Sequence, residues 1–137
     1  MTDLDYGDPL SRPFWAGARD RRLVLQRCAD CGRWQHYPRP LCLGCESTAL
    51  ESVPASGLGT IYSCTTVRIP ARPDLEPPYI AAIVELDEGP RMLTNIAADA
   101  ARIGDRVRVG WRDREDAPPL PIFTVEASAN ASVDSDA

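Results

Sequence analysis

The stretch from Cys28 to Cys45, "CADCGRWQHYPRPLCLGC", decides the fold of this chain, because it holds two Cys-x-x-Cys pairs separated by ten residues. Structural zinc takes four ligands in a tetrahedron, and each Cys-x-x-Cys turn presents two thiolates from one knuckle of backbone. Gly32 and Gly44 favour such tight turns, since glycine adopts backbone angles that other residues avoid. The spacing therefore predicts a structural site with four thiolates, with zinc as the leading metal.

Three other readings of the four cysteines stay open from the residues alone. Rubredoxin-type iron uses the same four ligands as zinc. A thioredoxin-like dithiol opens a helix after a buried strand and usually occurs once, whereas these two pairs lie in a loop rich in Gly, Pro and aromatic residues. Disulfides are uncommon in the reducing cytoplasm, which is the default location for a chain whose first ten residues do not resemble a signal peptide.

The other residues that often carry chemistry have structural interpretations here. His36 is the only histidine, and four cysteines already complete a metal shell, so we expect it to be exposed or packed on the loop. Cys64 lies in the middle of "YSCTTV", where a small core residue fits better than a reactive thiol. The sequence contains no Gly-x-Ser-x-Gly, phosphate-binding or His-Glu-x-x-His motif, so we predict no catalytic residue.

The residues before the cysteine pairs predict a leader, a helix and a strand. Residues 1–9 are acidic and are expected to be flexible. "SRPFWAGARDRR" predicts a short helix that begins near Ser11, with Phe14, Trp15 and Ala18 on one side. "RLVLQRC" predicts a brief strand that leads into the first pair. We therefore assign residues 10–53 to one helix-and-ribbon module.

Residues 54–126 are typical of an all-β module. "GTIYSCTTVRIP", "YIAAIVELDEGPRMLTNI", "IGDRVRVGWRDR" and "LPIFTVEA" together predict five strands, with a hairpin turn at residues 87–90 and the side chains of Val107, Val109 and Trp111 facing inward. "AADAAR", residues 97–102, predicts one or two helical turns between the third and fourth strands. This order matches a five-stranded OB-fold barrel, with a small open β-sandwich as the alternative.

The remaining segments are a proline-rich loop at 71–78 and a small, polar tail at 127–137 that we expect to be disordered. The net charge is −5, but residues 10–53 carry seven Arg against four acids. Residues 54–126 carry eight Arg against eleven acids, so the barrel segment is acidic. No stretch approaches the roughly 20 apolar residues of a membrane span, so we expect a cytoplasmic protein without a membrane partner.

Across residues 9–125 the chain resembles the family catalogued as domain of unknown function thirty-five. The likeness rests on "RPFWAGARDRRLVLQRCADCGRWQHYPRPLCLGC", "SGLGTIYSCTTV", "PYIAAIVELDEGPRMLTNI" and "IGDRVRVGW". The resemblance implies a mainly β chain with a short N-terminal helix, a rubredoxin-like zinc ribbon and a C-terminal OB-fold. It also implies one structural zinc ion per chain, held by Cys28, Cys31, Cys42 and Cys45.

The same resemblance implies a function. Members of the family are similar to accessory subunits of thiolase-superfamily enzymes, which include acyl-CoA thiolases, acyltransferases and lipid-transfer-protein-like aldolases that cleave steroid side-chain CoA esters. The chain is therefore expected to be a free-standing, non-catalytic subunit that stabilises such an enzyme and borders its acyl-CoA site. The expected complex is a heterotetramer with a partner dimer.

The expected partner surface consists of aromatic and arginine side chains, which are the commonest interface anchors. Trp34, Tyr37 and Arg39 are its main candidates, and Phe14 and Trp15 either join it or form core between ribbon and barrel. Single-stranded nucleic-acid binding is the alternative function, since zinc ribbons and OB-folds often bind nucleic acid. The acidic barrel segment argues against it, and we predict no nucleic-acid partner.

Overall fold

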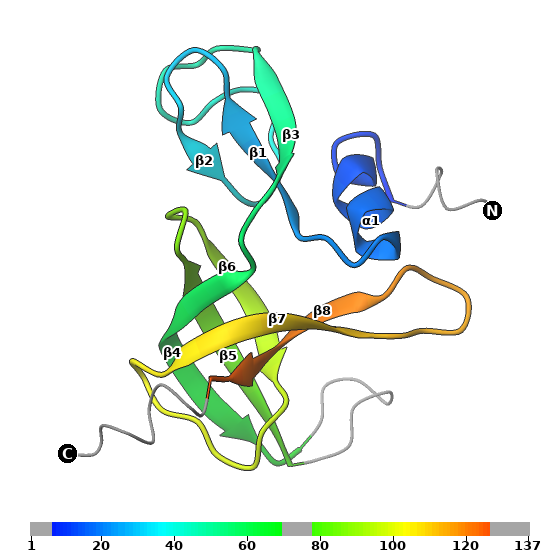
Figure 1. Ribbon diagram of the computed structural model, residues 1–137, viewed down its shortest axis with the longest axis vertical. Coiled ribbons are helices and arrows are strands. Elements are labelled where there is room, and N and C mark those ends of the chain that lie inside the picture. Colours follow the sequence, from blue (N-terminus) through cyan, green and yellow to red (C-terminus); the bar gives the residue numbers. More distant parts are fainter. Residues whose placement is uncertain (1–6, 70–77, 127–137) are drawn as a thin grey trace.

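The computed structural model describes residues 7–69 and 78–126 (Figure 1). The predictions of a flexible leader, a proline-rich loop and a disordered tail fall almost entirely outside these ranges. Within them the chain is mainly β, with one short helix, a small three-stranded sheet and a closed barrel. The predicted fold class is confirmed.

Helix α1 spans Arg12–Arg19 and begins where the sequence predicts. Ser11 is its N-cap residue, and a proline lies in the first turn, where its missing N–H costs no hydrogen bond. Phe14 and Ala18 are buried, while Trp15 is only half-buried. The helix therefore packs through one face onto the rest of the molecule.

The ribbon is a three-stranded antiparallel sheet in the order β2-β1-β3. Its strands are β1 (Val24–Cys28), β2 (Trp34–Gln35) and β3 (Leu50–Pro54). β3 lies in a segment for which the sequence predicts no strand, and it pairs with β1 along its whole length from Val24↔Pro54 to Cys28↔Leu50. The chain enters and leaves the ribbon at one place, because the N–H of Ala55 donates to the carbonyl of Leu23 at 2.7 Å.

Five strands form a closed barrel in the order β4-β5-β6-β8-β7, which confirms the OB-fold prediction over an open sandwich. The strands are β4 (Leu58–Val67), β5 (Tyr79–Leu86), β6 (Arg91–Ile96), β7 (Arg106–Arg112) and β8 (Leu120–Val125). Alternate residues fill the interior, as β-strand geometry requires. Ile61, Val84, Val107 and Phe123 are almost completely buried there.

The predicted helical turns at residues 97–102 are wrong, because this segment has no helix. Its neighbouring backbone groups bond to other parts of the fold. The Asp105 carboxylate accepts the N–H of Arg102 at 2.9 Å, and the N–H of Gly104 donates to the carbonyl of Ile61 at 2.8 Å. The Cys64 thiol lies 3.7 Å from the carbonyl of Ala101. These contacts fix the segment as a loop on β4 and outweigh a local helix propensity.

Helix, ribbon and barrel share one hydrophobic core. Figure 1 shows the ribbon standing over one end of the barrel, with α1 between the ribbon and the β7–β8 hairpin. Phe14, Leu23 and Leu25 belong to the same buried cluster as the barrel residues. Within residues 7–69 and 78–126, no helix has the length and apolar character needed to cross a membrane.

Candidate metal centre

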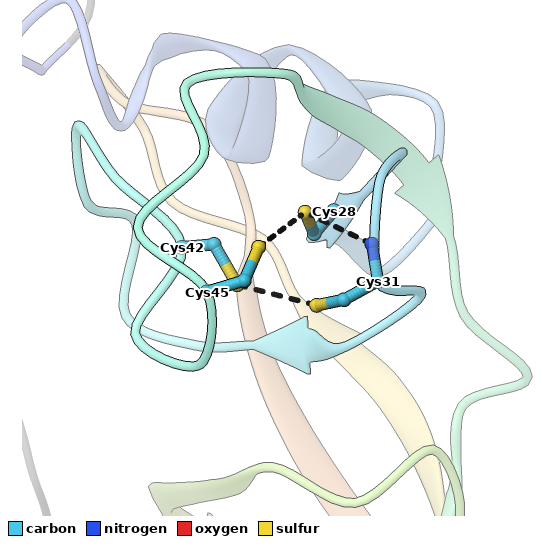
Figure 2. Close-up of side chains that lie close together, drawn as sticks. All are labelled: Cys28, Cys31, Cys42 and Cys45. Atoms are coloured by element: carbon cyan, nitrogen blue, oxygen red, sulfur yellow. Dashed lines mark hydrogen bonds between the residues drawn. The ribbon is translucent and has the colours of Figure 1, made fainter.

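The four cysteine side chains converge at one end of the ribbon (Figure 2). Their Sγ atoms all lie within 4.8 Å of one another. Cys28 is the last residue of β1, Cys31 lies in the turn before β2, and Cys42 and Cys45 come from the loop that leads to β3. The fold therefore brings together the four cysteines whose spacing predicts a metal site.

The two cysteine knuckles have the same backbone geometry, offset along the chain. In the first, the N–H of Gly32 donates to the carbonyl of Cys28 at 2.9 Å, and the N–H of Cys28 donates to the carbonyl of Arg33 at 2.8 Å. In the second, the N–H of Glu46 donates to the carbonyl of Cys42 at 2.9 Å, and the N–H of Cys42 donates to the carbonyl of Ser47 at 2.9 Å. Each pair of cysteines is thus held by an equivalent closed turn.

The residue that follows each knuckle has a left-handed backbone. Gly32 has φ 79°, as the sequence predicts for a glycine in that position. Glu46 is its equivalent in the second knuckle and has φ 65°, which is uncommon for a residue with a Cβ. Gly44 has a different part, because its N–H points at the Sγ of Cys42 at 3.3 Å. The second knuckle therefore keeps the turn without the glycine that usually marks it.

The sulfur geometry fits a tetrahedral metal ion. Two Sγ pairs, Cys28 with Cys45 and Cys31 with Cys42, are separated by 3.6 Å. Zn–S bonds of about 2.3 Å place two sulfurs of a regular tetrahedron about 3.8 Å apart. The five cysteines of the chain are free thiols, so these separations are contacts between unbonded sulfur atoms. Four cysteines are therefore positioned for metal binding.

Backbone amides favour the thiolate form of the first cysteine in each knuckle. The N–H of Cys31 points at the Sγ of Cys28 at 3.5 Å and lowers the pKa of that thiol. The pKa of Cys42 is lowered to about 6, first by the backbone N–H of Cys45 and also by that of Gly44. Metals bind the thiolate rather than the thiol, so this arrangement prepares the two buried ligands.

Two glutamines that the sequence analysis did not identify hold the second knuckle in place. Gln35 is buried, and its side chain donates to the carbonyl of Leu41 at 3.1 Å and accepts the N–H of Leu43 at 3.0 Å. Its amide also donates to Gln26 at 2.9 Å, and Gln26 bonds the N–H and carbonyl of Arg39. The facing positions of these two amides on β1 and β2 are visible only once the strand register is known.

His36 lies outside the group of four sulfurs and packs on the loop, as expected. Its ring centroid lies 5.3 Å from that of Phe14 and 4.2 Å from that of Tyr37. Burial lowers the pKa of His36 to about 4, so the imidazole is neutral at pH 7. Its Nδ1 is buried without a hydrogen-bond partner among the described residues.

The residues expected to bind a partner fall into two groups. Phe14 belongs to the shared core with 8% of its surface exposed, and Trp15 and Trp34 pack half-buried against that core. Tyr37 is 49% exposed, and Arg39 is also exposed. A partner-binding role stays a prediction for all five.

Two family models match consecutive parts of the chain. Residues 15–51 match the ChsH2 rubredoxin-like zinc ribbon domain. Residues 52–112 match the ChsH2 C-terminal OB-fold domain. The match agrees with the order of ribbon and barrel in the structure.

Two curated relatives are longer proteins. The chain is 42% identical over 114 residues to a probable enoyl-CoA hydratase alpha subunit of Thermomonospora curvata. The matched segment is 80% of this chain and 36% of the relative. It is also 38% identical over 125 residues to the 3-oxo-4,17-pregnadiene-20-carboxyl-CoA hydratase alpha subunit of Mycobacterium tuberculosis. Here the matched segment is 83% of this chain and 40% of the relative. The chain thus spans well under half the length of each.

Other proteins match over most of their length. The fold resembles a solved chain of the Ltp2-ChsH2(DUF35) aldolase with a TM-score of 0.80 and 36% identity, covering 88% of this chain and 97% of that one. A DUF35 domain-containing scaffold protein of Methanothermobacter thermautotrophicus is 34% identical over 95 residues, which is 66% of this chain and 71% of the relative. The chain therefore belongs to the DUF35 family, with the zinc ribbon and OB-fold domains of the ChsH2 type.

Proposed function

We propose that this chain is a non-catalytic accessory subunit of a thiolase-superfamily enzyme that acts on acyl-CoA substrates. The likeness to a chain of the Ltp2-ChsH2(DUF35) aldolase, which extends over 97% of that chain, carries the proposal. In this proposal, the functional modules of the present chain are residues 10–53 and 54–126. Its partner is an aldolase, thiolase or acyltransferase subunit in the reducing cytoplasm. The steroid side-chain aldolase is one member of this class.

Two exposed residues that follow β2, Tyr37 and Arg39, support a docking role. The backbone of Arg39 is clamped on both sides by the Gln26 side chain, at 2.9 Å and 3.0 Å. Its guanidinium makes no ion pair with any described residue, so it is available to a carboxylate of another chain. Tyr37 lies two residues away in the sequence and is half-exposed. An exposed arginine with a fixed backbone, close in sequence to an exposed tyrosine, is typical of an interface anchor.

The metal centre has a structural part in this proposal. Cys28, Cys31, Cys42 and Cys45 would hold one zinc ion, and four thiolates leave no open coordination position. Zinc binding supplies folding free energy to a ribbon whose sheet has only a two-residue strand on one side. The ribbon would thereby present Tyr37 and Arg39 in a fixed position, so the ion acts on docking and not on the reaction.

The proposed assembly is a partner dimer with one accessory subunit per protomer, in which the ribbon side of this chain borders the acyl-CoA site. The direct test is co-expression of this chain with a thiolase-superfamily subunit from the same genome. We expect the two chains to elute together in size-exclusion chromatography. Activity on acyl-CoA should appear only in fractions that contain the partner.

Arg39→Glu and a matched control sharpen the test. Arg39→Glu should raise the dissociation constant of the complex at least tenfold while the metal content stays unchanged, because it reverses the charge at the proposed anchor. Arg68→Glu makes the same change at an exposed residue beyond β4 and should leave the complex intact. Turnover by the isolated chain, or separate elution of two folded subunits, would contradict the proposal.

A further inference from the structure

Arg33 contacts both cysteine knuckles. Its carbonyl accepts the N–H of Cys28 at 2.8 Å, which closes the turn of the first knuckle. Its side chain crosses to the second knuckle, where a Cβ added to Gly44 would lie 3.0 Å from the Cδ of Arg33 and 3.6 Å from its Nη1. The same added Cβ would lie 3.7 Å from the Sγ of Cys42. The guanidinium and this sulfur therefore lie on the same side of Gly44.

Gly44 leaves open the space beside which the Arg33 side chain lies. Gly44 does not have the left-handed backbone of Gly32, so its backbone angles do not call for a glycine. Its tightest steric conflict with a Cβ is the 3.0 Å contact to the Cδ of Arg33, whereas carbon atoms pack best at about 3.5–4.0 Å. The glycine at this position therefore makes room for an arginine rather than for a turn.

The metal centre requires positive charge around it. A divalent ion bound by four thiolates leaves a net charge of about −2 on the cluster. Cys28 and Cys42 are buried, so water cannot fully solvate this charge. Asp30 in the first knuckle and Glu46 after the second are exposed acids on the same turns. Without a nearby cation, this end of the ribbon would therefore be strongly negative.

Two arginines lie at the knuckles, and their charges are not equally available. The Nη2 of Arg27 would lie 3.7 Å from a Cβ at Gly32, so Arg27 lies beside the first knuckle. Its charge is shared with Glu51, because the two side chains form an ion pair at 4.0 Å. Arg33 forms no ion pair within the described part of the chain and is exposed. Arg33 is therefore the arginine whose charge acts on the metal centre.

We propose that Arg33 is a positioning residue of the metal centre, whose guanidinium lies across the second knuckle and stabilises the charged, metal-bound form of the four thiolates. It contributes to the affinity for the ion and supplies no ligand. The inference rests on the four-cysteine zinc site proposed above, and it does not depend on the accessory role of the chain.

The test measures the dissociation constant of the full-length chain for Zn²⁺ by competition with a chromophoric chelator. Arg33→Gln removes the charge, and we expect a rise of about fivefold, as for a charge interaction at an exposed residue. Arg33→Glu reverses the charge and should raise the constant more than about tenfold. Arg33→Lys keeps the charge and should stay within about twofold of the parent.

Salt separates the charge of Arg33 from its packing. The screening length falls from about 30 Å at 0.01 M salt to about 3 Å at 1 M. The difference between the parent and Arg33→Gln should therefore shrink as salt is added, which an effect of packing would not do. Arg68→Glu is the matched control, because it reverses a charge at an exposed position beyond β4. It should leave the dissociation constant within about twofold of the parent.

A double-mutant cycle tests the contact at Gly44. Gly44→Ala keeps the N–H that points at the Sγ of Cys42 at 3.3 Å, but its Cβ displaces the Arg33 side chain. We expect a loss of affinity of about threefold in the parent and none in the Arg33→Ala background, where no Cδ remains to be displaced. The absorption spectra of Co²⁺-loaded variants should match that of the parent, because all four thiolates are retained.

Several results would overturn the proposal. Unchanged affinity in folded Arg33→Gln and Arg33→Glu would remove Arg33 from the metal centre. An equal loss in Arg68→Glu would assign the effect to the overall charge of the chain. A loss that does not change with salt would assign it to packing, and additive losses in the cycle would separate Arg33 from Gly44. Failure of the parent to bind Zn²⁺ would contradict the four-cysteine site itself.

Discussion

The backbone N–H of Leu93 donates to the hydroxyl oxygen of Tyr37 at 3.0 Å, and this bond joins the ribbon to the barrel across 56 positions of sequence. Tyr37→Phe removes the acceptor and leaves the ring in place. We expect the free energy of unfolding to fall by about 1 kcal/mol, as for one hydrogen bond, and the Leu93 amide to exchange faster with solvent. Hydrogen exchange and urea unfolding measure the two effects.

Tyr62→Phe is the matched control. Tyr62 is also about half-exposed, and the guanidinium carbon of Arg91 lies 3.7 Å from the centroid of its ring. Its hydroxyl, however, bonds to no described residue. Its removal should leave stability within about 0.5 kcal/mol of the parent. Equal losses in the two variants would mean that the Tyr37 hydroxyl does not connect the modules.

The two left-handed residues of the metal knuckles predict opposite mutational effects. A Cβ at Gly32 would meet nothing closer than 3.7 Å, so its backbone angle alone opposes substitution. Gly32→Ala should therefore lower the free energy of unfolding by about 1 kcal/mol. Glu46→Gly relieves the same strain in the second knuckle and should raise it slightly or leave it unchanged. Urea unfolding of the metal-loaded proteins gives both values, and effects of the same sign would contradict the equivalence of the knuckles.

These knuckles also show what a sequence reveals and what it does not. The cysteine spacing and the helix start at Ser11 are local signals, and the structure confirms that the four cysteines converge and that Ser11 is the N-cap residue. Glu46 carries no glycine signal for its left-handed backbone, because the closed turn imposes that conformation. β3 forms because it pairs with β1. Residues 97–102 form no helix, because part of their backbone bonds to distant strands instead. What depends on partners far along the chain was not predictable from a short window.

The same limit applies to the site. Phe14, Trp15 and Tyr37 stand out as aromatic residues in the sequence, but their union around one cavity depends on the packing of helix, ribbon and barrel. Gln26 and Gln35 have no motif, and their importance lies in the register that sets them face to face. The convergence of the four cysteines was therefore predictable, whereas the residues that hold their turns were not.

Metal removal should unfold the ribbon before the barrel. Cys42→Ser removes a buried ligand, and we expect one metal ion per parent chain and none in the variant. Cys64→Ser is the control, because Cys64 lies on β4 away from the four sulfurs and should keep the metal. Atomic emission and near-ultraviolet circular dichroism measure metal and packing. Metal retained by folded Cys42→Ser would contradict the four-sulfur site.

Stability should depend on pH through His36. The pKa of His36 is about 4 in the folded chain, below the ordinary histidine value of 6.5, so the unfolded chain takes up the extra proton first as the pH falls. Stability is therefore lost as pH falls through this window, by about 2 kcal/mol between pH 7 and pH 5. His36→Phe keeps a ring between Phe14 and Tyr37 and should reduce this loss. Urea unfolding at both pH values gives the comparison, and identical pH dependence in parent and variant would exclude His36 as the cause.

The arginines of β7 predict weak affinity for nucleic acid. Arg106 makes a bidentate pair with Asp87 at 2.8 Å and 2.9 Å, and Arg108 pairs with Glu126 at 3.2 Å. Paired charges leave little field to attract a phosphate backbone. We expect no binding of labelled single-stranded DNA or RNA in anisotropy titrations at physiological salt. Micromolar affinity that falls steeply with added salt would favour the nucleic-acid alternative.

The hydrogen bond between Ala55 and Leu23 closes the base of the ribbon, so the chain departs from and returns to a single point. A loop segment that starts and ends within the ribbon can change in length or sequence without moving the point where the chain leaves and returns. Because Leu23 and Leu25 belong to the shared core, such changes are expected in the segments that carry the cysteine knuckles rather than in the paired strands. This arrangement lets related proteins differ in the loop surface of the ribbon while they keep the same closed base and the same core.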